Sequence, residues 1–221
     1  MGNLWKGFKE HRTFRFTSLL VILLIALVVL APVIAPYNPL EAVMKDANQA
    51  PSMAHLFGTD KLGRDVLSRI LYGGAYSLSS VLALVVIIFC VGTFLGLVAG
   101  YFGGLIDTVI MRIADMMISF PGVILAIAIA GIMGGSLVNA MIALTAVTWT
   151  KYARLSRSMV LKIRKRDFVD AAIVSGGTSS HILWTHIMPN VVPILVITAV
   201  SDIGAMMMEL AGPSFLGFGR P

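Results

Sequence analysis

The stretch from Leu78 to Tyr101, LSSVLALVVIIFCVGTFLGLVAGY, decides the fold class of this chain. It contains no charged residue, and a membrane-spanning helix needs about 20 mainly apolar residues. Gly92, Gly96 and Gly100 recur at every fourth position, the small-xxx-small spacing that lets two membrane helices approach closely. The stretch therefore predicts a span, at residues 78–101, that packs tightly against a second helix.

The overall composition agrees with a membrane protein. The 221 residues are 57% hydrophobic and 13% charged, with a mean hydropathy of +0.89, whereas soluble domains carry about 25% charged residues. So few charges cannot cover a water-facing surface, and much of the exterior must face lipid. The single cysteine, Cys90, lies inside an apolar run and excludes an intramolecular disulfide.

The same length and hydropathy criteria predict an all-α polytopic membrane protein with five spans. Besides residues 78–101, the spans are expected at residues 16–36, 116–134, 136–150 and 191–211. The alternative for the first is a signal peptide, but its apolar run exceeds the about 7–15 residues typical of one, which favours an uncleaved anchor. Residues 37–76 are expected to form an external loop with an interfacial helix, and residues 77–221 hold the remaining spans.

The basic residues predict the orientation. Residues 1–15 are basic, and so is the loop at residues 151–190, which carries Lys151, Arg154, Arg157, Lys162, Arg164, Lys165 and Arg166 against Asp167 and Asp170. Basic loops stay in the cytoplasm, and a cytoplasmic N-terminus with four crossings places both clusters there. The formal charge of +6 therefore needs no nucleic-acid partner, and the basic segment lacks the interleaved aromatic residues of a nucleic-acid binder.

The basic loop is the most informative segment. Leu155 to Val174 reads as an amphipathic helix, and Gly176-Gly177 ends it. Residues 178–180 offer N-cap side chains for a second short helix, which is expected to end before Pro189. The loop is either a surface that touches anionic lipid headgroups or a docking element for a soluble partner, and periodicity leaves both open.

Catalytic motifs are missing from the sequence. It has no phosphate-binding loop of the G-x-x-x-x-G-K-[ST] type, no H-E-x-x-H zinc motif and no Ser/His/Asp set. An enzyme is therefore not indicated.

Residues 170–190 resemble a known loop. The pattern Asp170-Ala171-Ala172-x3-Gly176-x9-His186-x-Met188-Pro189 is similar to the EAA loop of binding-protein-dependent ABC importers. Asp170 stands where that family usually has Glu, which keeps the charge on a shorter arm.

Four further stretches resemble the dipeptide, oligopeptide and nickel permeases of that family, in the family's order. They are Phe57-Gly58-Thr59-Asp60-x-Leu62-Gly63-Arg64-Asp65, Gly103-Gly104-x2-Asp107-x3-Met111-Arg112-x2-Asp115, Tyr152-Ala153-Arg154-x2-Arg157 and Ser214-Phe215-Leu216-Gly217-Phe218-Gly219. One such stretch would be weak, but together they cover nearly all of the chain after residue 55.

The resemblance implies a type I ABC importer transmembrane domain, with five of the usual six spans before the chain stops at Pro221. It implies a bacterial inner-membrane complex with a second permease subunit, two ATP-binding subunits and an extracytoplasmic solute-binding protein. ATP and magnesium would be used by the partner subunits, with no cofactor on this chain. The residues implied to couple to an ATPase are Asp170, Ala171, Ala172, Gly176, His186 and Pro189.

Two acids within the last span are candidates for lining a transport pathway. Asp202, Met206 and Glu209 share one face of a helix, and acids inside a membrane usually face a bundle interior or a watery cavity. The alternative is that Asp202 pairs with a neighbouring helix while Glu209 is solvated near the outer interface. Direct metal binding with the methionines at 206–208 is less favoured, because thioethers suit softer ions, and no metal site is predicted.

On the outer side, Asp60, Arg64 and Asp65 are candidates for contact with the solute-binding protein. The alternative is an interfacial helix with local i,i+4 ion pairs. Arg112 and Asp115 are expected to pair at the cytoplasmic edge.

The cargo follows from the last span only by resemblance. Asp202-Ile203-Gly204-x-Met206-Met207 is more similar to nickel permeases than to peptide permeases, which indicates nickel or a nickel chelate as the cargo. A dipeptide or oligopeptide is the alternative. A self-sufficient secondary transporter or channel is a further alternative, and it would need a coupling-ion site of its own, for which Asp202 and Glu209 are the candidates.

Overall fold

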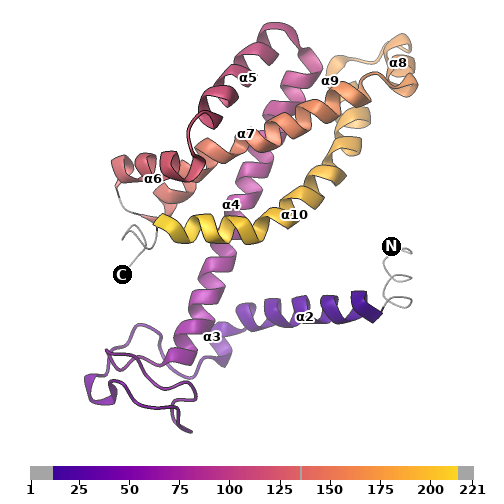
Figure 1. The fold of residues 1–221 in the computed structure, drawn as a ribbon. Coiled ribbons are helices and arrows are strands. Elements are labelled where there is room, and N and C mark those ends of the chain that lie inside the picture. The colour runs from indigo at the N-terminus through magenta and orange to yellow at the C-terminus, as the bar shows by residue number, and fades with distance from the viewer. Residues whose placement is uncertain (1–11, 135, 214–221) are drawn as a thin grey trace. The chain divides into compact units, whose positions relative to one another are not determined.

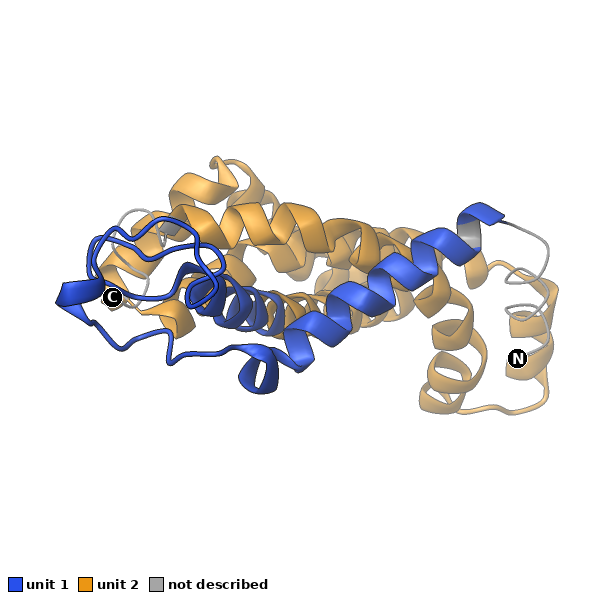
Figure 2. Cartoon of the chain, turned by 90° about the horizontal axis from the view of Figure 1, so that it is seen from below, with its two compact units in different colours: residues 1–80 blue, residues 81–221 orange. Residues whose placement is uncertain are grey.

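A computed structural model describes residues 12–134 and 136–213, and all regular elements within these ranges are helices (Figure 1). The chain divides into two compact units, residues 1–80 and residues 81–221 (Figure 2). Helix α4 (Val66–Phe102) has residues in both. The all-α class predicted from composition is confirmed.

Unit 1 begins with α2 (Arg12–Val29) and the short α3 (Ala31–Ile34), which follow each other across Leu30. Nearly every described side chain of α2 is exposed. Its apolar part, Arg15–Val29, is shorter than the helices that are long enough to cross a membrane, so the span predicted at residues 16–36 is only partly formed by this helix. Between α3 and α4 the chain is irregular apart from one 3₁₀ turn, η1 (Met44–Asp46). The interfacial helix predicted within residues 37–76 is therefore wrong for the part that precedes α4.

Unit 2 contains the rest of α4 and a helical bundle. Its elements are α5 (Gly104–Ile118), α6 (Gly122–Met133), α7 (Leu137–Ile163), α8 (Asp167–Val174), α9 (Ser179–Ile182), the π-helical η2 (Leu183–Ile187) and α10 (Met188–Pro213).

Two helical stretches of the described residues, α4 and Ser179–Gly212, are long and apolar enough to cross a membrane. A third is the pair α5 and α6, which is bent by 91°. The bend lies at Pro121, where the missing N–H and the ring of proline break a helix. The span predicted at residues 116–134 is thus not one straight helix.

Helix α7 is long but more polar than those two stretches, and its own neighbours cover it. Ala143, Tyr152 and Val160 are almost completely buried, so polar residues on α7 need not meet lipid. The helix also runs to Ile163, beyond the span predicted at residues 136–150. The amphipathic helix predicted from residue 155 to 174 is really the end of α7 and the separate α8, joined by a turn.

The glycine spacing of α4 is explained by α7. A Cβ atom on Gly96 would lie 2.3 Å from the carbonyl oxygen of Ala153 and 2.6 Å from the Cβ of Ser156. A Cβ atom on Gly92 would lie 2.5 Å from the backbone oxygen of Trp149, and one on Gly100 would lie 2.8 Å from the Cβ of Val160. The predicted close helix contact is confirmed.

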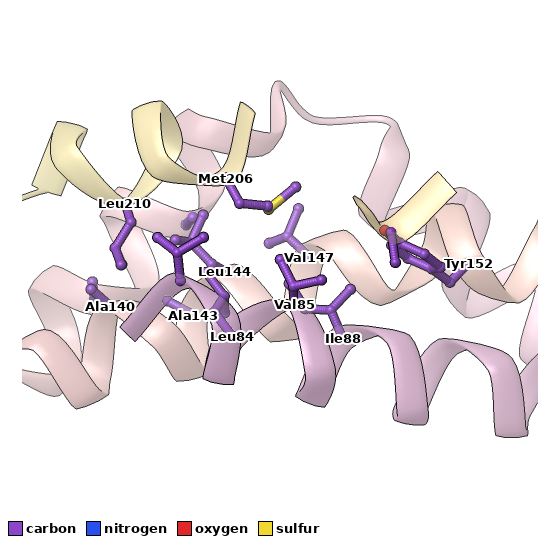
Figure 3. Packing of buried hydrophobic residues seen from close by; sticks show 14 residues of the cluster. Leu84, Val85, Ile88, Ala140, Ala143, Leu144, Val147, Tyr152, Met206 and Leu210 are labelled. Carbon is purple, nitrogen blue, oxygen red and sulfur yellow. The ribbon is translucent and has the colours of Figure 1, made fainter. Parts of the chain in front are cut away.

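The main core of unit 2 lies where α4, α7 and α10 meet (Figure 3). Leu84 and Ile88 of α4 pack with Leu144 of α7, and Met206 and Leu210 enter the same cluster from α10. The core thus fixes α10 against the α4–α7 pair.

Candidate functional site

The loop that resembles the EAA loop begins with α8, which ends in a glycine turn. Gly176 has a φ of +80°; its N–H donates to the carbonyl of Ile173, and that of Gly177 to the carbonyl of Ala172, both at 3.0 Å. This pair of bonds closes a helix where glycine adopts the left-handed conformation. Thr178 then caps α9, because its hydroxyl accepts from the backbone N–H of His181 at 3.3 Å. The predicted break and N-cap are confirmed.

The second helix of the loop does not end before Pro189, so that expectation is wrong. Helix α9 continues through η2 into α10. Pro189 has no N–H for the carbonyl one turn earlier, and the wider π-helical turn accommodates this loss. The side-chain amide of Asn190 donates to the carbonyl of His186 at 2.6 Å. Ser179–Gly212 is therefore one continuous helical stretch.

The inner side of the loop is part of a second core cluster. Val169 of α8, Ile182 of α9 and Ile187 of η2 are buried. They pack with residues at the ends of three long helices: Leu97, Tyr101, Val160, Val191 and Leu195. In Figure 1, α8 and α9 lie where α7 ends and α10 begins. The buried side of the loop is therefore packed against the ends of α4, α7 and α10.

The outer side of the loop is open. Ile173 and Val174 are 51% and 87% exposed, although both are apolar. Of the predicted coupling residues, Asp170, Ala171, Gly176 and Pro189 are exposed, and Ala172 and His186 are half-buried. The apolar side chains of Ile173 and Val174 are thus exposed at the end of α8, whose Val169 is buried.

Asp202 of α10 forms an ion pair with α7. Its two carboxylate oxygens each lie 2.7 Å from Nζ of Lys151, and the hydroxyl of Tyr152 donates to it at 2.9 Å. The alternative that Asp202 pairs with a neighbouring helix describes this arrangement. The sequence had not indicated Lys151 as the partner, although an acid inside a membrane needs an opposite charge and Lys151 was placed just beyond a predicted span.

The other two pathway candidates, Met206 and Glu209, lie in different surroundings. Met206 is 5% exposed and belongs to the main core. Glu209 lines a pocket of about 320 Å³ with Lys151, Thr148 and the residues around the α5–α6 bend, including Phe120. The three residues share a helix but not a surface. Among the described residues, no cluster of three His, Cys, Asp or Glu side chains could hold a metal ion.

Two of the stretches that carry the family resemblance pair with each other. Arg157 donates to Asp107 through Nε at 2.5 Å and through a terminal nitrogen at 2.6 Å. Arg154 lies 2.5 Å from Asp115. These pairs tie α5 to α7, and the predicted pair between Arg112 and Asp115 is wrong, because Asp115 faces Arg154.

Asp60 organises the irregular segment of unit 1 between α3 and α4. Its carboxylate accepts from the backbone N–H groups of Leu62 and Arg64 at 2.8 and 3.0 Å, from Nε of Arg64 at 2.9 Å, and also from Arg69. Partial desolvation raises the pKa of Asp60, but these hydrogen bonds and the Arg64 charge outweigh it and lower the pKa to about 2. The predicted pair of Asp60 and Arg64 forms, but in a turn with Gly63 at φ +72° rather than in a helix.

Asp65 is the N-terminal cap of α4. It accepts from the backbone N–H and the hydroxyl of Ser68 at 2.8 and 2.7 Å, and His55 Nδ1 lies 3.0 Å away. Burial raises the pKa of Asp65, but these partners outweigh it and lower the pKa below its usual value. Because Asp65 is only 3% exposed, Asp60 and Arg64 are the more accessible of the three residues predicted to face a binding protein.

Comparison with known proteins defines the class. Residues 92–221 match the family described as binding-protein-dependent transport system inner membrane component. Residues 1–51 match the N-terminal transmembrane domain of oligopeptide transport permease C. The chain belongs to the binding-protein-dependent transport system inner membrane component family, and so has the membrane domain of a type I ABC importer.

Individual relatives narrow the family to one branch. The nickel transport system permease protein NikC of Escherichia coli is 38% identical over 203 residues, covering 91% of this chain and 73% of the relative. The dipeptide transport system permease protein DppC of Haemophilus influenzae is 36% identical, with 97% and 75% covered. The glutathione transport system permease protein GsiD of Pectobacterium atrosepticum is 37% identical, with 97% and 72% covered.

The chain is therefore an ABC importer permease of the nickel, peptide and glutathione branch. The sequence motifs predicted the nickel and peptide permeases, and the glutathione relatives extend that prediction. Relatives of this kind are permease subunits and are not catalytic. Their identities to this chain are nearly equal, so similarity alone does not choose among their cargoes.

Proposed function

We propose that this chain forms half of a translocation pathway in the bacterial inner membrane and couples it to ATP hydrolysis through residues 167–187. The N-terminus and this loop lie in the cytoplasm. A second permease subunit, two ATP-binding subunits that hold ATP and magnesium, and an extracytoplasmic solute-binding protein complete the complex. The observation that carries the proposal is the apolar, exposed tip at Ile173 and Val174 on a base that is buried among helix ends.

The coupling works as rigid-body motion. A docked ATPase would push on the tip, and Val169 and Ile182 would pass the displacement to the ends of α4, α7 and α10, with which they pack. Packed helices respond to such a push by rocking or shear rather than by local deformation. The ion pair of Lys151 and Asp202 then holds α10 to α7, so both helices move together.

The docking proposal is tested by changing the tip without touching its base. The double variant Ile173→Glu/Val174→Glu places two carboxylates on exposed positions, so the permease should fold but no longer co-purify with the ATP-binding subunits. Met53→Glu is the matched control, since Met53 is 98% exposed in the outer loop. Undiminished co-purification of the double variant would refute docking through this loop and favour a secondary transporter or channel.

For the cargo, we propose a nickel chelate, with a dipeptide or oligopeptide as the alternative. Support for nickel comes from the run of residues 202–207 and from the similarity to the Escherichia coli nickel permease. A chelate is favoured over the bare ion because Lys151 neutralises Asp202 and Met206 is buried. A chelate brings its own metal ligands, so the pathway needs none.

Uptake by cells that carry the whole transport system tests the cargo. Deletion of this chain should abolish uptake of radioactive nickel in the presence of a chelator and leave dipeptide uptake intact. Loss of labelled dipeptide uptake with unchanged nickel uptake would establish the peptide alternative.

A further inference from the structure

A pocket of about 530 Å³ lies beside the coupling loop, where α7 ends and α10 begins. Met159, Lys162 and Ile163 of α7 line it, and so does Arg166, which lies in the turn between α7 and α8. The start of α8 adds Asp167 and Phe168, and α10 adds Asn190 and Ile194. Lys162 and Arg166 stand against one acid, Asp167, so the lining is net positive, and this charged part meets an apolar part at the end of the bundle.

The two bases of the pocket have no ion-pair partner among the described residues, unlike Arg154 and Arg157 earlier on α7. Arg154 and Arg157 are paired with Asp115 and Asp107, and Arg164 donates to the carbonyl of Tyr101 at 2.7 Å. Within residues 12–134 and 136–213, no ion pair involves Lys162 or Arg166, and both are exposed. Their positive charge is available for a ligand.

The apolar part continues from the pocket along α10. Ile194 lines the pocket, and Ile197 and Val200, one and two turns further on, are exposed as well. A ligand with a charged head and a hydrocarbon tail would match both parts. A basic pocket between helices on the cytoplasmic side is suited to an anionic lipid headgroup.

We propose that this pocket binds an anionic phospholipid, with its phosphate between Lys162 and Arg166 and an acyl chain along Ile194 and Ile197. Because Phe168 belongs both to the pocket and to α8, a bound lipid would brace the base of the coupling loop. The inference rests on the proposed function only for the placement of this end of the bundle in the cytoplasm.

Native mass spectrometry of the purified complete transporter tests the site, with phosphatidylglycerol and phosphatidylcholine as probes. Phosphatidylglycerol should be retained more strongly than phosphatidylcholine. Lys162→Gln and Arg166→Gln should each weaken its retention about fivefold, the effect of one base near a lipid surface. Lys165→Gln is the matched control, because Lys165 is an exposed neighbour that does not line the pocket.

Several results would overturn the proposal. Equal retention of the two lipids, or an equal loss in Lys165→Gln, would show a diffuse charge effect and no site. Displacement of the lipid by inorganic phosphate would show that the acyl chain contributes nothing. Unchanged lipid retention with loss of ATPase subunits in Lys162→Gln would assign the surface to a protein partner. Labelling of a Ser180→Cys/Cys90→Ser variant from the outside only would refute the orientation, independently of the lipid result.

Discussion

Gly96 offers the sharpest test of how the bundle is held together. Its ideal Cβ position lies 2.3 Å from the carbonyl oxygen of Ala153, while ordinary contacts begin near 3.4 Å. Gly96→Ala therefore forces α4 and α7 apart by about 1 Å, since the atoms in the way are backbone and cannot rotate aside. Overpacking of this kind costs about 1–3 kcal/mol, which is about a 5- to 150-fold shift in the folding equilibrium. The displacement would also strain the 3.1 Å hydrogen bond from Ser156 to the carbonyl of Thr93.

The assay is the thermal stability of the purified transporter in detergent. Gly204→Ala is the matched control, because Gly204 lies in α10 with nothing within 4 Å of its Cβ position. By helix propensity alone the control should be neutral or stabilising by up to about 1 kcal/mol. If Gly96→Ala is as stable as Gly204→Ala, the close approach of α4 and α7 is refuted.

Three further predictions concern charge and backbone. Asp202→Asn should destabilise the bundle, because it leaves Lys151 without its carboxylate partner. The loss should be smaller than the about 3–5 kcal/mol of a fully buried pair, because Lys151 is half-exposed. The double variant with Lys151→Gln should regain part of this loss in a thermal melt, and no regain would refute the pairing. The segment between α3 and α4 should resist proteolysis from pH 7 to about pH 5 and loosen as the pH falls from about 4 toward 2, because the lowered pKa of Asp60 gives stability only while the carboxylate is charged. An Asp60→Asn variant with the same pH profile would contradict this. Gly176→Ala should lower the folding stability by about 1–2 kcal/mol, the penalty for a side chain in the left-handed conformation. The melting temperature measures this loss, and an unchanged value would contradict the positive φ.

The sequence predicted the membrane class and the close helix contact because both depend on local patterns. A long uncharged run and a four-residue glycine spacing each have one physical explanation. The turn at Gly176 and the cap at Thr178 were equally local. These features needed no knowledge of what lies opposite them.

The missed features depend on partners far apart in the sequence. Lys151 and Asp202 are 51 residues apart, and Asp115 pairs with Arg154 rather than with Arg112 on its own helix. Helix α7 was cut short because its polar residues look unsuited to lipid until its covering helices are known. Pro189 was expected to end a helix, but a π-helical turn lets the helix pass it.

The proposed coupling role of residues 167–187 depends most directly on whether the tip of α8 touches an ATPase. The photo-crosslinking residue p-benzoylphenylalanine at position 174, where Val174 is 87% exposed, should give a light-dependent adduct with an ATP-binding subunit in the assembled transporter. The same residue at position 132, where Ile132 is 89% exposed at the end of α6, should give none. An assembled transporter with no adduct from position 174, or with equal adducts from both positions, would contradict the coupling role of this loop.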